Sequence, residues 1–318
     1  MDKFKCDLCP NNCLLTPNGF GKCGNRTQNL GMFSIGSIDK IENRNLYHVY
    51  PGTKTLSMGS LGCNLTCPWC QNWSISREHS KFKSNTLRYF KPKELLNLAV
   101  SESLNSITFT YNEPIISYEY IVDAAKLFKK HGIKTYMESC GYISSKYLSS
   151  FFENIDAVNI DIKLFNNDRY KSILGGDLDT ILNTILFLSK SDTWLEISML
   201  LIPGLNDSTT EITNLASWVF NKLGDSIPLH FKAFHPSYKF KNIQGTTKPM
   251  ITKAIRVAKE VGLRHVYPDY ITGETSSNTY CPSCGGILVD RLNSHIKNNL
   301  VDGVCPNPKC GRGLGGLY

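Results

Sequence analysis

The sequence lacks any apolar run that approaches the ~18–20 residues of a membrane-spanning helix. The segment Met1 to Cys6 also lacks the apolar stretch of a secretory signal peptide. We therefore expect a soluble, cytoplasmic protein with no membrane partner. Of its 318 residues, 41% are hydrophobic, which suffices for a sizeable core, and the length suggests two domains or one long α/β barrel.

The sequence also lacks a long run of Lys and Arg, although its formal net charge is +8. Such a charge fits an anionic substrate, an acidic partner or nucleic acid, but the basic residues are scattered and a solvated surface is the simpler interpretation. One alternative is a zinc-containing nucleic-acid-binding protein. Against it, neither cysteine-rich end carries a cluster of Arg with aromatic residues, so nucleic acid is the less favoured partner.

Twelve cysteines without a secretion signal favour metal binding over disulfides, because the cytosol keeps thiols reduced. Two quartets flank a triplet, a grouping that disulfide pairing would not predict. The groups are Cys6, Cys9, Cys13 and Cys23; then Cys63, Cys67 and Cys70; then Cys140 alone; then Cys281, Cys284, Cys305 and Cys310.

The triplet Cys63, Cys67 and Cys70 lies in one tight loop directly after a strand-like run. Three thiolates can hold three irons of a [4Fe–4S] cube, and the fourth iron then has no protein ligand. An open coordination position is typical of a metal site that carries out chemistry. The alternative is a fragment of a zinc site, but no fourth Cys or His lies close by in the sequence.

The two quartets predict small metal-binding modules at residues 1–50 and 276–318. The first, Cys6 to Cys23, can close a zinc tetrahedron or ligate an auxiliary Fe–S cluster, and its spacing does not decide between them. The second, Cys281 to Cys310, is typical of a zinc ribbon, with a rubredoxin-like single iron as the alternative.

Between the modules, residues 51–275 alternate between strand-like runs and helix-period patterns, which predicts an α/β fold with a parallel sheet. Fewer than eight clear repeats favour an incomplete barrel. We expect Asn206 or Asp207 to cap the helix that follows the fifth strand. The expected strands are 55–60, 106–111, 134–138, 157–161, 194–202, 228–234 and 264–267, preceded by one or two strands within 31–41.

Polar residues follow several of these strands, at the edge where parallel sheets form their sites. They are Asn112 and Glu113, Glu138 and Ser139, Asp161 and Lys163, and His235. A simple strand-to-helix turn could explain Glu113, and a surface ion pair could explain Asp161 with Lys163. We expect His230 to be a satisfied core histidine and Cys140 to be a small, buried, inert thiol.

The triplet, with an aromatic residue before its last cysteine, resembles the radical S-adenosylmethionine (radical SAM) family. The motifs at the strand ends resemble its glycyl-radical-enzyme activases, such as pyruvate formate-lyase-activating enzymes. The N-terminal quartet, the Tyr111–Pro114 stretch and the C-terminal quartet resemble the AmmeMemoRadiSam system radical SAM enzymes more closely. Tyr111 and Asn112 replace two glycines of the broad family pattern.

The resemblance implies a partial (β/α)6 barrel that holds a [4Fe–4S] cluster on Cys63, Cys67 and Cys70 and binds SAM. By the same resemblance, each site residue has an expected role. Trp69 lies near adenine, the backbone at Asn112 and Glu113 binds the SAM amino group, Glu138, Ser139 and Asp161 lie near a monovalent cation, Lys163 pairs with the SAM carboxylate, and His235 contacts SAM.

We therefore expect an oxidoreductase or lyase that cleaves SAM reductively to a 5′-deoxyadenosyl radical. The two cysteine-rich modules could close the mouth of the barrel, which favours a small substrate. The basic charge makes a phosphorylated molecule one option. The alternative within enzymes is activation of a glycyl radical enzyme. An electron donor such as flavodoxin or ferredoxin is implied, and partner proteins of the AmmeMemo system follow from the resemblance alone.

Overall fold

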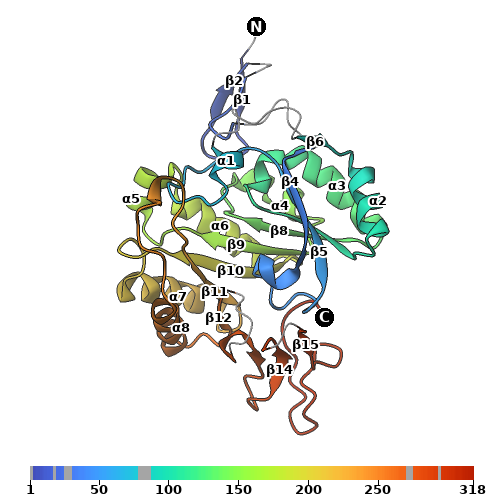
Figure 1. The fold of residues 1–318 in the computed structure, drawn as a ribbon, viewed down its shortest axis with the longest axis vertical. Coiled ribbons are helices and arrows are strands. Elements are labelled where there is room, and N and C mark those ends of the chain that lie inside the picture. Colours follow the sequence, from blue (N-terminus) through green and yellow to red (C-terminus); the bar gives the residue numbers. More distant parts are fainter. Residues whose placement is uncertain (1–2, 17–18, 25–30, 78–86, 270–274, 293–294) are drawn as a thin grey trace.

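An eight-stranded sheet forms the centre of the protein in the computed structural model, which describes residues 3–16, 19–24, 31–77, 87–269, 275–292 and 295–318 (Figure 1). The strand order is β12-β11-β10-β9-β8-β7-β5-β4, and every neighbouring pair is parallel except β4 and β5. The strands are β4 (Ile35–Lys40), β5 (Lys54–Gly59), β7 (Ser106–Phe109), β8 (Lys134–Ser139), β9 (Ala157–Ile162), β10 (Trp194–Leu201), β11 (Leu229–Ala233) and β12 (Val266–Pro268).

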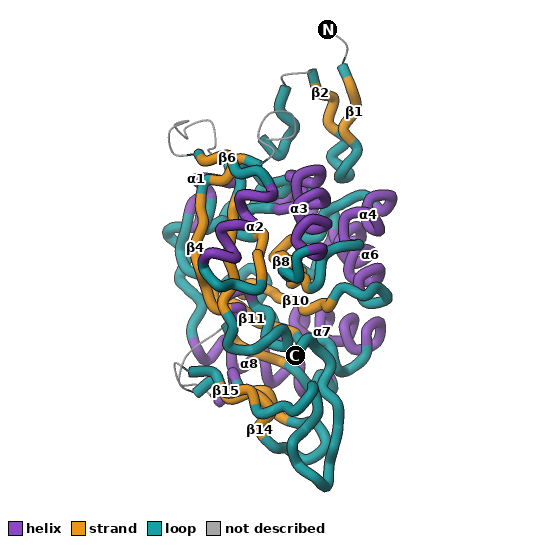
Figure 2. The backbone as a smooth tube through the Cα atoms, turned by 90° about the vertical axis from the view of Figure 1, so that its right-hand side faces the viewer, coloured by secondary structure: helices purple, strands orange, loops and turns teal. Residues whose placement is uncertain are grey.

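Helices connect the parallel strands, and Figure 2 shows α3, α4, α6 and α7 along one side of the sheet. No helix among the described residues is long and apolar enough to cross a membrane. The α-helices are α1 (Trp73–Ser76), α2 (Pro92–Ser101), α3 (Tyr118–Lys130), α4 (Leu148–Phe152), α5 (Asn167–Arg169), α6 (Leu178–Leu188), α7 (Thr209–Leu223) and α8 (Lys248–Val261). Shorter turns are η1 (Ile41–Arg44), η4 (Pro114–Ser117), η5 (Ser145–Tyr147), the π-helical η6 (Tyr170–Leu174), η7 (Tyr238–Phe240) and η8 (Thr275–Ser277).

The two cysteine-rich ends of the chain lie at opposite ends of the long axis (Figure 1). The N-terminal hairpin joins β1 (Phe4–Cys6) to β2 (Cys13–Leu15), and the C-terminal sheet joins β13 (Thr279–Tyr280), β14 (Ile287–Asp290) and β15 (Lys297–Asn298). A further pair, β3 (Met32–Phe33) with β6 (Arg88–Tyr89), completes the strands. β4 belongs to the first fifty residues, yet it pairs with β5 of the central sheet.

The predicted α/β fold with an incomplete barrel is confirmed, because the sheet is mostly parallel and ends in the two edge strands β12 and β4. All seven core strands lie within two residues of their expected bounds. The periodic helices also bury the expected face, as Ile212, Leu215 and Val219 do in α7.

The predicted cap of α7 is wrong. Ser208 caps this helix, and its side chain accepts a hydrogen bond from the backbone N–H of Glu211. Asn206 is instead fully buried, where its amide donates to the carbonyls of Lys163 and Leu200 at 3.0 and 2.8 Å. This amide therefore ties the end of β9 to β10, a contact between segments far apart in the sequence.

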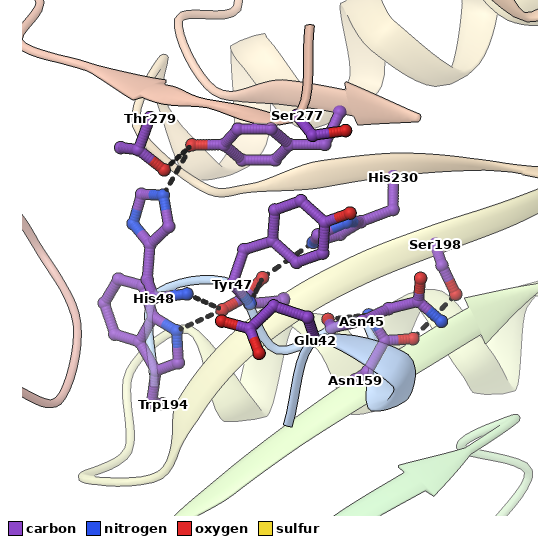
Figure 3. A network of polar contacts seen from close by, with 12 residues as sticks. Glu42, Asn45, Tyr47, His48, Asn159, Trp194, Ser198, His230, Ser277 and Thr279 are labelled. Carbon is purple, nitrogen blue, oxygen red and sulfur yellow. Dashed lines mark hydrogen bonds and ion pairs between the residues drawn. The ribbon is translucent and has the colours of Figure 1, made fainter. Parts of the chain in front are cut away.

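A buried carboxylate, Glu196 of β10, anchors the loop that follows η1. It accepts hydrogen bonds from the backbone N–H groups of Tyr47 and His48, at 3.0 and 2.8 Å, and from the Trp194 indole at 3.1 Å. The imidazole of His230 lies 2.6 Å from it, in a pair with no solvent exposure. Figure 3 shows how these side chains gather around the loop.

The C-terminal module reaches the same loop through Arg291, which is fully buried. Its guanidinium donates to the Tyr47 carbonyl at 2.6 Å and stacks over the Tyr47 ring at 4.3 Å. It also lies 3.7 Å from the carboxylate of Glu42, another fully buried group. Arg291 therefore neutralises a buried charge and joins the module to the central sheet.

We predict that Arg291→Met lowers the free energy of unfolding by about 3–5 kcal/mol, because it leaves the Glu42 carboxylate buried without its counter-ion. Urea unfolding of the anaerobically prepared protein measures the change. Arg256→Met is the matched control, since Arg256 forms an exposed pair with Glu260 in α8 that contributes only about 0.3–0.5 kcal/mol. Equal losses in the two variants would contradict this role for Arg291.

Candidate active site

A cavity of about 480 Å³ lies at the carboxyl ends of the parallel strands, where sites form in sheets of this kind. Its lining comes from β8 and β11, from segments that follow β5, β7, β8, β9 and β12, and from η1 with the residue after it. The structure brings eight of the predicted site residues to this one cavity. They are Cys63, Cys67, Cys70, Asn112, Glu113, Glu138, Ser139 and Lys163.

The loop that carries the three cysteines bonds extensively to other segments. Asn112 accepts from the backbone N–H of Ser60 at 3.0 Å and donates to the Gly62 carbonyl at 2.8 Å. Arg77 donates to the carbonyls of Cys63 and Leu65 at 3.4 and 3.2 Å. These contacts satisfy backbone groups that would otherwise be buried without partners.

The triplet is partly shielded from water, with Cys67 buried and Cys63 and Cys70 half-buried. Burial raises the pKa of Cys63 and raises the pKa of Cys67 to about 12. Because metal sites require thiolates, metal binding here has to displace protons. Cys140 also lines the cavity, but its thiol donates to Asn64 at 3.7 Å, and burial raises its pKa well above the usual value.

Charged side chains of both signs meet beside the triplet. Lys163 lies 2.6 Å from Asp161, and Lys232 lies 3.7 Å from both Asp161 and Glu138. Arg44 approaches Glu138 from the loop side at 3.3 Å. Such a mixture of fixed charges suits a ligand that carries an ammonium and a carboxylate on neighbouring atoms.

The lysines keep the two carboxylates ionised despite burial. Burial alone would raise the pKa of Asp161, but Lys163 and Lys232 outweigh it and leave that pKa below its usual value. Burial likewise opposes ionisation of Glu138, and Lys232 with Arg44 lowers its pKa. Asp161 Oδ1 is buried and has no hydrogen-bond partner among the described residues, so this oxygen can still accept a ligand.

Glu113 is committed to contacts within the protein. Its carboxylate accepts hydrogen bonds from the Ser139 hydroxyl at 2.7 Å and from the backbone N–H groups of Cys140 and Ile115, at 2.8 and 3.1 Å. It therefore fixes the end of β8 against the turn after β7. The neighbouring Tyr111 adopts a positive φ of 70°, a conformation that a non-glycine residue rarely takes without support.

Three residues predicted to bind SAM or a cation, namely Trp69, Asp161 and His235, lie outside the lining of this cavity. Asp161 contacts the lining through its ion pairs with Lys163 and Lys232, two lining residues. Trp69 is buried in the core, where its ring packs 5.5 Å from that of Phe240. His235 is exposed after the end of β11. Their roles stay predictions. His230 is buried against Glu196, as expected for a core histidine, although its Nδ1 has no hydrogen-bond partner among the described residues.

The sequence analysis missed several lining residues, among them Arg44, Asn45, Lys232 and Asp269. Asp269 follows β12, so the rule that selected Asp161 could have selected it as well. Burial raises the pKa of Asp269, although Lys232 opposes this. Arg44 and Asn45 precede the loop anchored by Glu196, and no periodic pattern indicates that this segment turns back into the sheet.

The four C-terminal cysteines form a compact group whose sulfur atoms all lie within 4.8 Å of one another. The sulfurs of Cys281 and Cys310 are 3.6 Å apart, and those of Cys284 and Cys305 are 3.7 Å apart. A tetrahedral zinc with Zn–S bonds of about 2.3 Å separates its sulfurs by about 3.8 Å. The donor set therefore fits one tetrahedral metal ion.

The four N-terminal cysteines line a second, small cavity together with Asn64 and Ile116. The module lies directly against the triplet loop, because the backbone N–H of Cys63 donates to the Cys23 carbonyl at 3.0 Å. The side chain of Asn11 also donates to the Asn64 carbonyl at 3.0 Å. None of the twelve cysteines, all of which lie in the described part of the chain, forms a disulfide.

Comparison with known proteins gives one family match. The sequence model of the Radical SAM superfamily matches residues 59–216, a range that contains the triplet and the motifs of β7, β8 and β9.

Two relatives align with this chain over most of their own length. An uncharacterised protein of Methanocaldococcus jannaschii is 34% identical over 309 residues, which cover 93% of this chain and 91% of that protein. The pyruvate formate-lyase-activating enzyme of Clostridium pasteurianum is 26% identical over 243 residues, which cover 71% of this chain and 98% of that enzyme.

Among solved structures, a radical SAM methyltransferase from Sphaerobacter thermophilus aligns with a TM-score of 0.54 at 14% identity. The alignment covers 75% of this chain and 71% of that chain, and it shows a shared fold alone. Together, the matches confirm the predicted fold and enzyme class, whereas the finer resemblance to AmmeMemoRadiSam enzymes stays a prediction.

Proposed function

The chain belongs to the radical SAM superfamily, and on this premise we propose that it cleaves SAM reductively at a [4Fe–4S] cluster on Cys63, Cys67 and Cys70. When bound, the cluster supplies the electron that splits SAM into methionine and a 5′-deoxyadenosyl radical. The observation that carries the proposal is that these three thiols line one cavity with charged side chains of both signs.

The protein's own contribution is to hold three thiolates at one cavity, where they would ligate the cluster. Asn112 and Arg77 bond to the backbone of the loop and thereby fix its path. The buried Cys67 and the half-buried Cys63 would limit the access of water to a bound cluster. Cys140 is the remaining cysteine at the cavity, and its bond to Asn64 occupies its thiol.

We assign the methionine end of SAM to the charged group beside the triplet. Lys163 would pair with the SAM carboxylate, since a lysine is a compact cation on a flexible stem. The carbonyls of Asn112 and Glu113 would accept from the SAM amino group, because both of these side chains are already committed to protein contacts.

A monovalent cation remains part of the proposal. Asp161 Oδ1 lacks a hydrogen-bond partner among the described residues, and a hard oxygen of this kind suits such an ion. Lys232 already lies 3.7 Å from both Asp161 and Glu138. Ser139 follows Glu138 at the end of β8. Lys232 supplies a fixed positive charge at this place whether or not an ion binds.

The substrate is proposed to be a small molecule, because the cavity of about 480 Å³ falls within the range of small-ligand sites. Lys232 and Arg44 line it and could accept an acidic group such as a phosphate. The second candidate is activation of a glycyl radical enzyme, which the likeness to the pyruvate formate-lyase-activating enzyme favours.

The remaining partners follow from the same reasoning. Reductive cleavage needs a one-electron donor, for which we propose a flavodoxin or ferredoxin. Membership of the AmmeMemo system, with its partner proteins, is proposed from the sequence motifs alone. Twelve cysteines without a disulfide suit a reducing compartment, so we propose the cytoplasm. For the C-terminal quartet we propose zinc, with a single iron as the alternative.

We predict that Cys63→Ala/Cys67→Ala/Cys70→Ala abolishes 5′-deoxyadenosine formation, because no thiolate then remains to hold the cluster of the large cavity. The product is assayed anaerobically with SAM and dithionite. Cys140→Ala is the matched control and should retain product formation. Product formation by the triple variant, or its loss in Cys140→Ala alone, would contradict the assignment of the three ligands.

We also predict that Lys163→Met weakens SAM binding at least about tenfold, since a charged hydrogen bond contributes about 1.5–3 kcal/mol. Equilibrium dialysis with labelled SAM on the reconstituted, oxidised protein measures this affinity. The control is Lys134→Met, which removes a lysine of similar geometry, 2.8 Å from Asp156. Equal affinity in the Lys163 variant and the parent would rule out the carboxylate contact.

A further inference from the structure

The three cysteine groups differ in how far apart they hold their sulfur atoms. The C-terminal quartet, Cys281 to Cys310, holds all four within 4.8 Å, which is the spacing of a site for one ion. Within the described part of the chain, this is the one place where three or more ligand atoms of Cys, His, Asp or Glu lie so close together. The C-terminal quartet thus provides an internal standard for a single-ion site.

The N-terminal quartet departs from that standard. Its four cysteines surround a common cavity, yet no three of their sulfurs fall within the 4.8 Å limit among the described residues. The triplet Cys63, Cys67 and Cys70 behaves in the same way: its members share one cavity without forming a single-ion group. A cube binds each thiolate through a different iron, so it holds its ligands farther apart than one tetrahedral ion does.

Backbone contacts hold this wider arrangement in place. Cys6 and Cys13 face each other across the β1–β2 hairpin, and the Cys23 carbonyl accepts from the backbone N–H of Cys63 at 3.0 Å. Gly21 passes beside the sulfurs, where an added Cβ would lie 3.4 Å from Cys13 Sγ and 3.5 Å from Cys23 Sγ. The backbone of the folded module therefore fixes the distances between the sulfur atoms of the quartet.

One contact also matches the chemistry of a cluster. The backbone N–H of Lys22 points at the sulfur of Cys13, at 3.4 Å. Hydrogen bonds from backbone N–H groups to sulfur stabilise ligated thiolates and tune the potential of Fe–S clusters. Such a bond occurs at zinc sites and at Fe–S clusters alike, so it does not distinguish them. The wide spacing of the sulfur atoms favours a cluster over a single zinc ion.

We propose that Cys6, Cys9, Cys13 and Cys23 bind a second iron–sulfur cluster, and that zinc is restricted to the C-terminal quartet. This resolves the choice that the sequence spacing left open. The proposal goes beyond SAM cleavage and does not depend on it, because it rests on the geometry of the N-terminal module.

The second cluster would lie next to the first. Asn64, the neighbour of Cys63 in the triplet loop, forms part of the wall of the N-terminal cavity. The Ser144 backbone N–H donates to the Leu8 carbonyl at 2.8 Å and helps to fix the module on the barrel. In this position, the second cluster would accept one electron from a flavodoxin- or ferredoxin-type donor and pass it to the first, with no bond formed or broken.

The test begins with Cys63→Ala/Cys67→Ala/Cys70→Ala, which leaves the N-terminal quartet intact. After anaerobic reconstitution with iron, sulfide and zinc, we expect about four irons and four sulfides per chain to remain, with about one zinc in the C-terminal quartet. Full loss of iron with about two zincs per chain would overturn the proposal.

A second variant, Cys6→Ser/Cys9→Ser/Cys13→Ser, should lose about half of the iron of the parent protein and keep its single zinc. If this variant fails to fold, the triplet variant still decides the outcome. Electron paramagnetic resonance adds a measure of distance. The spectrum of the reduced parent should show a magnetic interaction between two clusters that is absent from both variants. A parent spectrum equal to the simple sum of the two variant spectra would contradict the adjacency of the clusters.

The two hypotheses fail separately. A parent protein that binds about eight irons but forms no 5′-deoxyadenosine would contradict the proposed function and support the second cluster. A parent protein that forms 5′-deoxyadenosine and binds only about four irons, all lost in the triplet variant, would support the proposed function and contradict the second cluster.

Discussion

The constraint on which the structure depends is that one short loop must present three thiols to a cavity while its own backbone remains satisfied. Gly62 has a φ of +93°, and a Cβ there would lie 2.1 Å from the Cys23 carbonyl. The loop can therefore pack against the N-terminal module only through a residue without a side chain. Asn112 and Arg77 take up its remaining backbone groups, so the module, the loop and the strand ends form one interdependent assembly.

At the opposite end of the molecule, buried charge has a comparable role. Glu196 holds the loop after η1 by its backbone, and Arg291 reaches that loop from the C-terminal module. Arg44, just before this loop, lines the large cavity. The C-terminal cysteine quartet is thereby connected to the wall of the candidate active site through protein contacts, although the two cysteine modules lie at opposite ends of the long axis.

Local sequence patterns predicted the features that depend on interactions between residues close together in the sequence. Apolar runs gave the core strands to within two residues, and the clustered cysteines indicated three separate groups. The cap of α7 was wrong because Asn206 bonds instead to Lys163 of another strand, which no local pattern encodes. Arg44 was missed for the same reason: its segment turns back onto the sheet through long-range bonds to Glu138, Asn159 and Glu196. The spacing of the N-terminal sulfurs also depends on a contact made forty residues along the chain, at Cys63.

The central claim is that the triplet leaves one iron open to SAM. The most direct measurement is the electron paramagnetic resonance spectrum of the reduced protein before and after addition of SAM, with the triplet variant as reference. The account predicts that the signal absent from the triplet variant changes shape when SAM binds, because SAM ligates the open iron. A signal that depends on the triplet but is identical with and without saturating SAM would contradict the account.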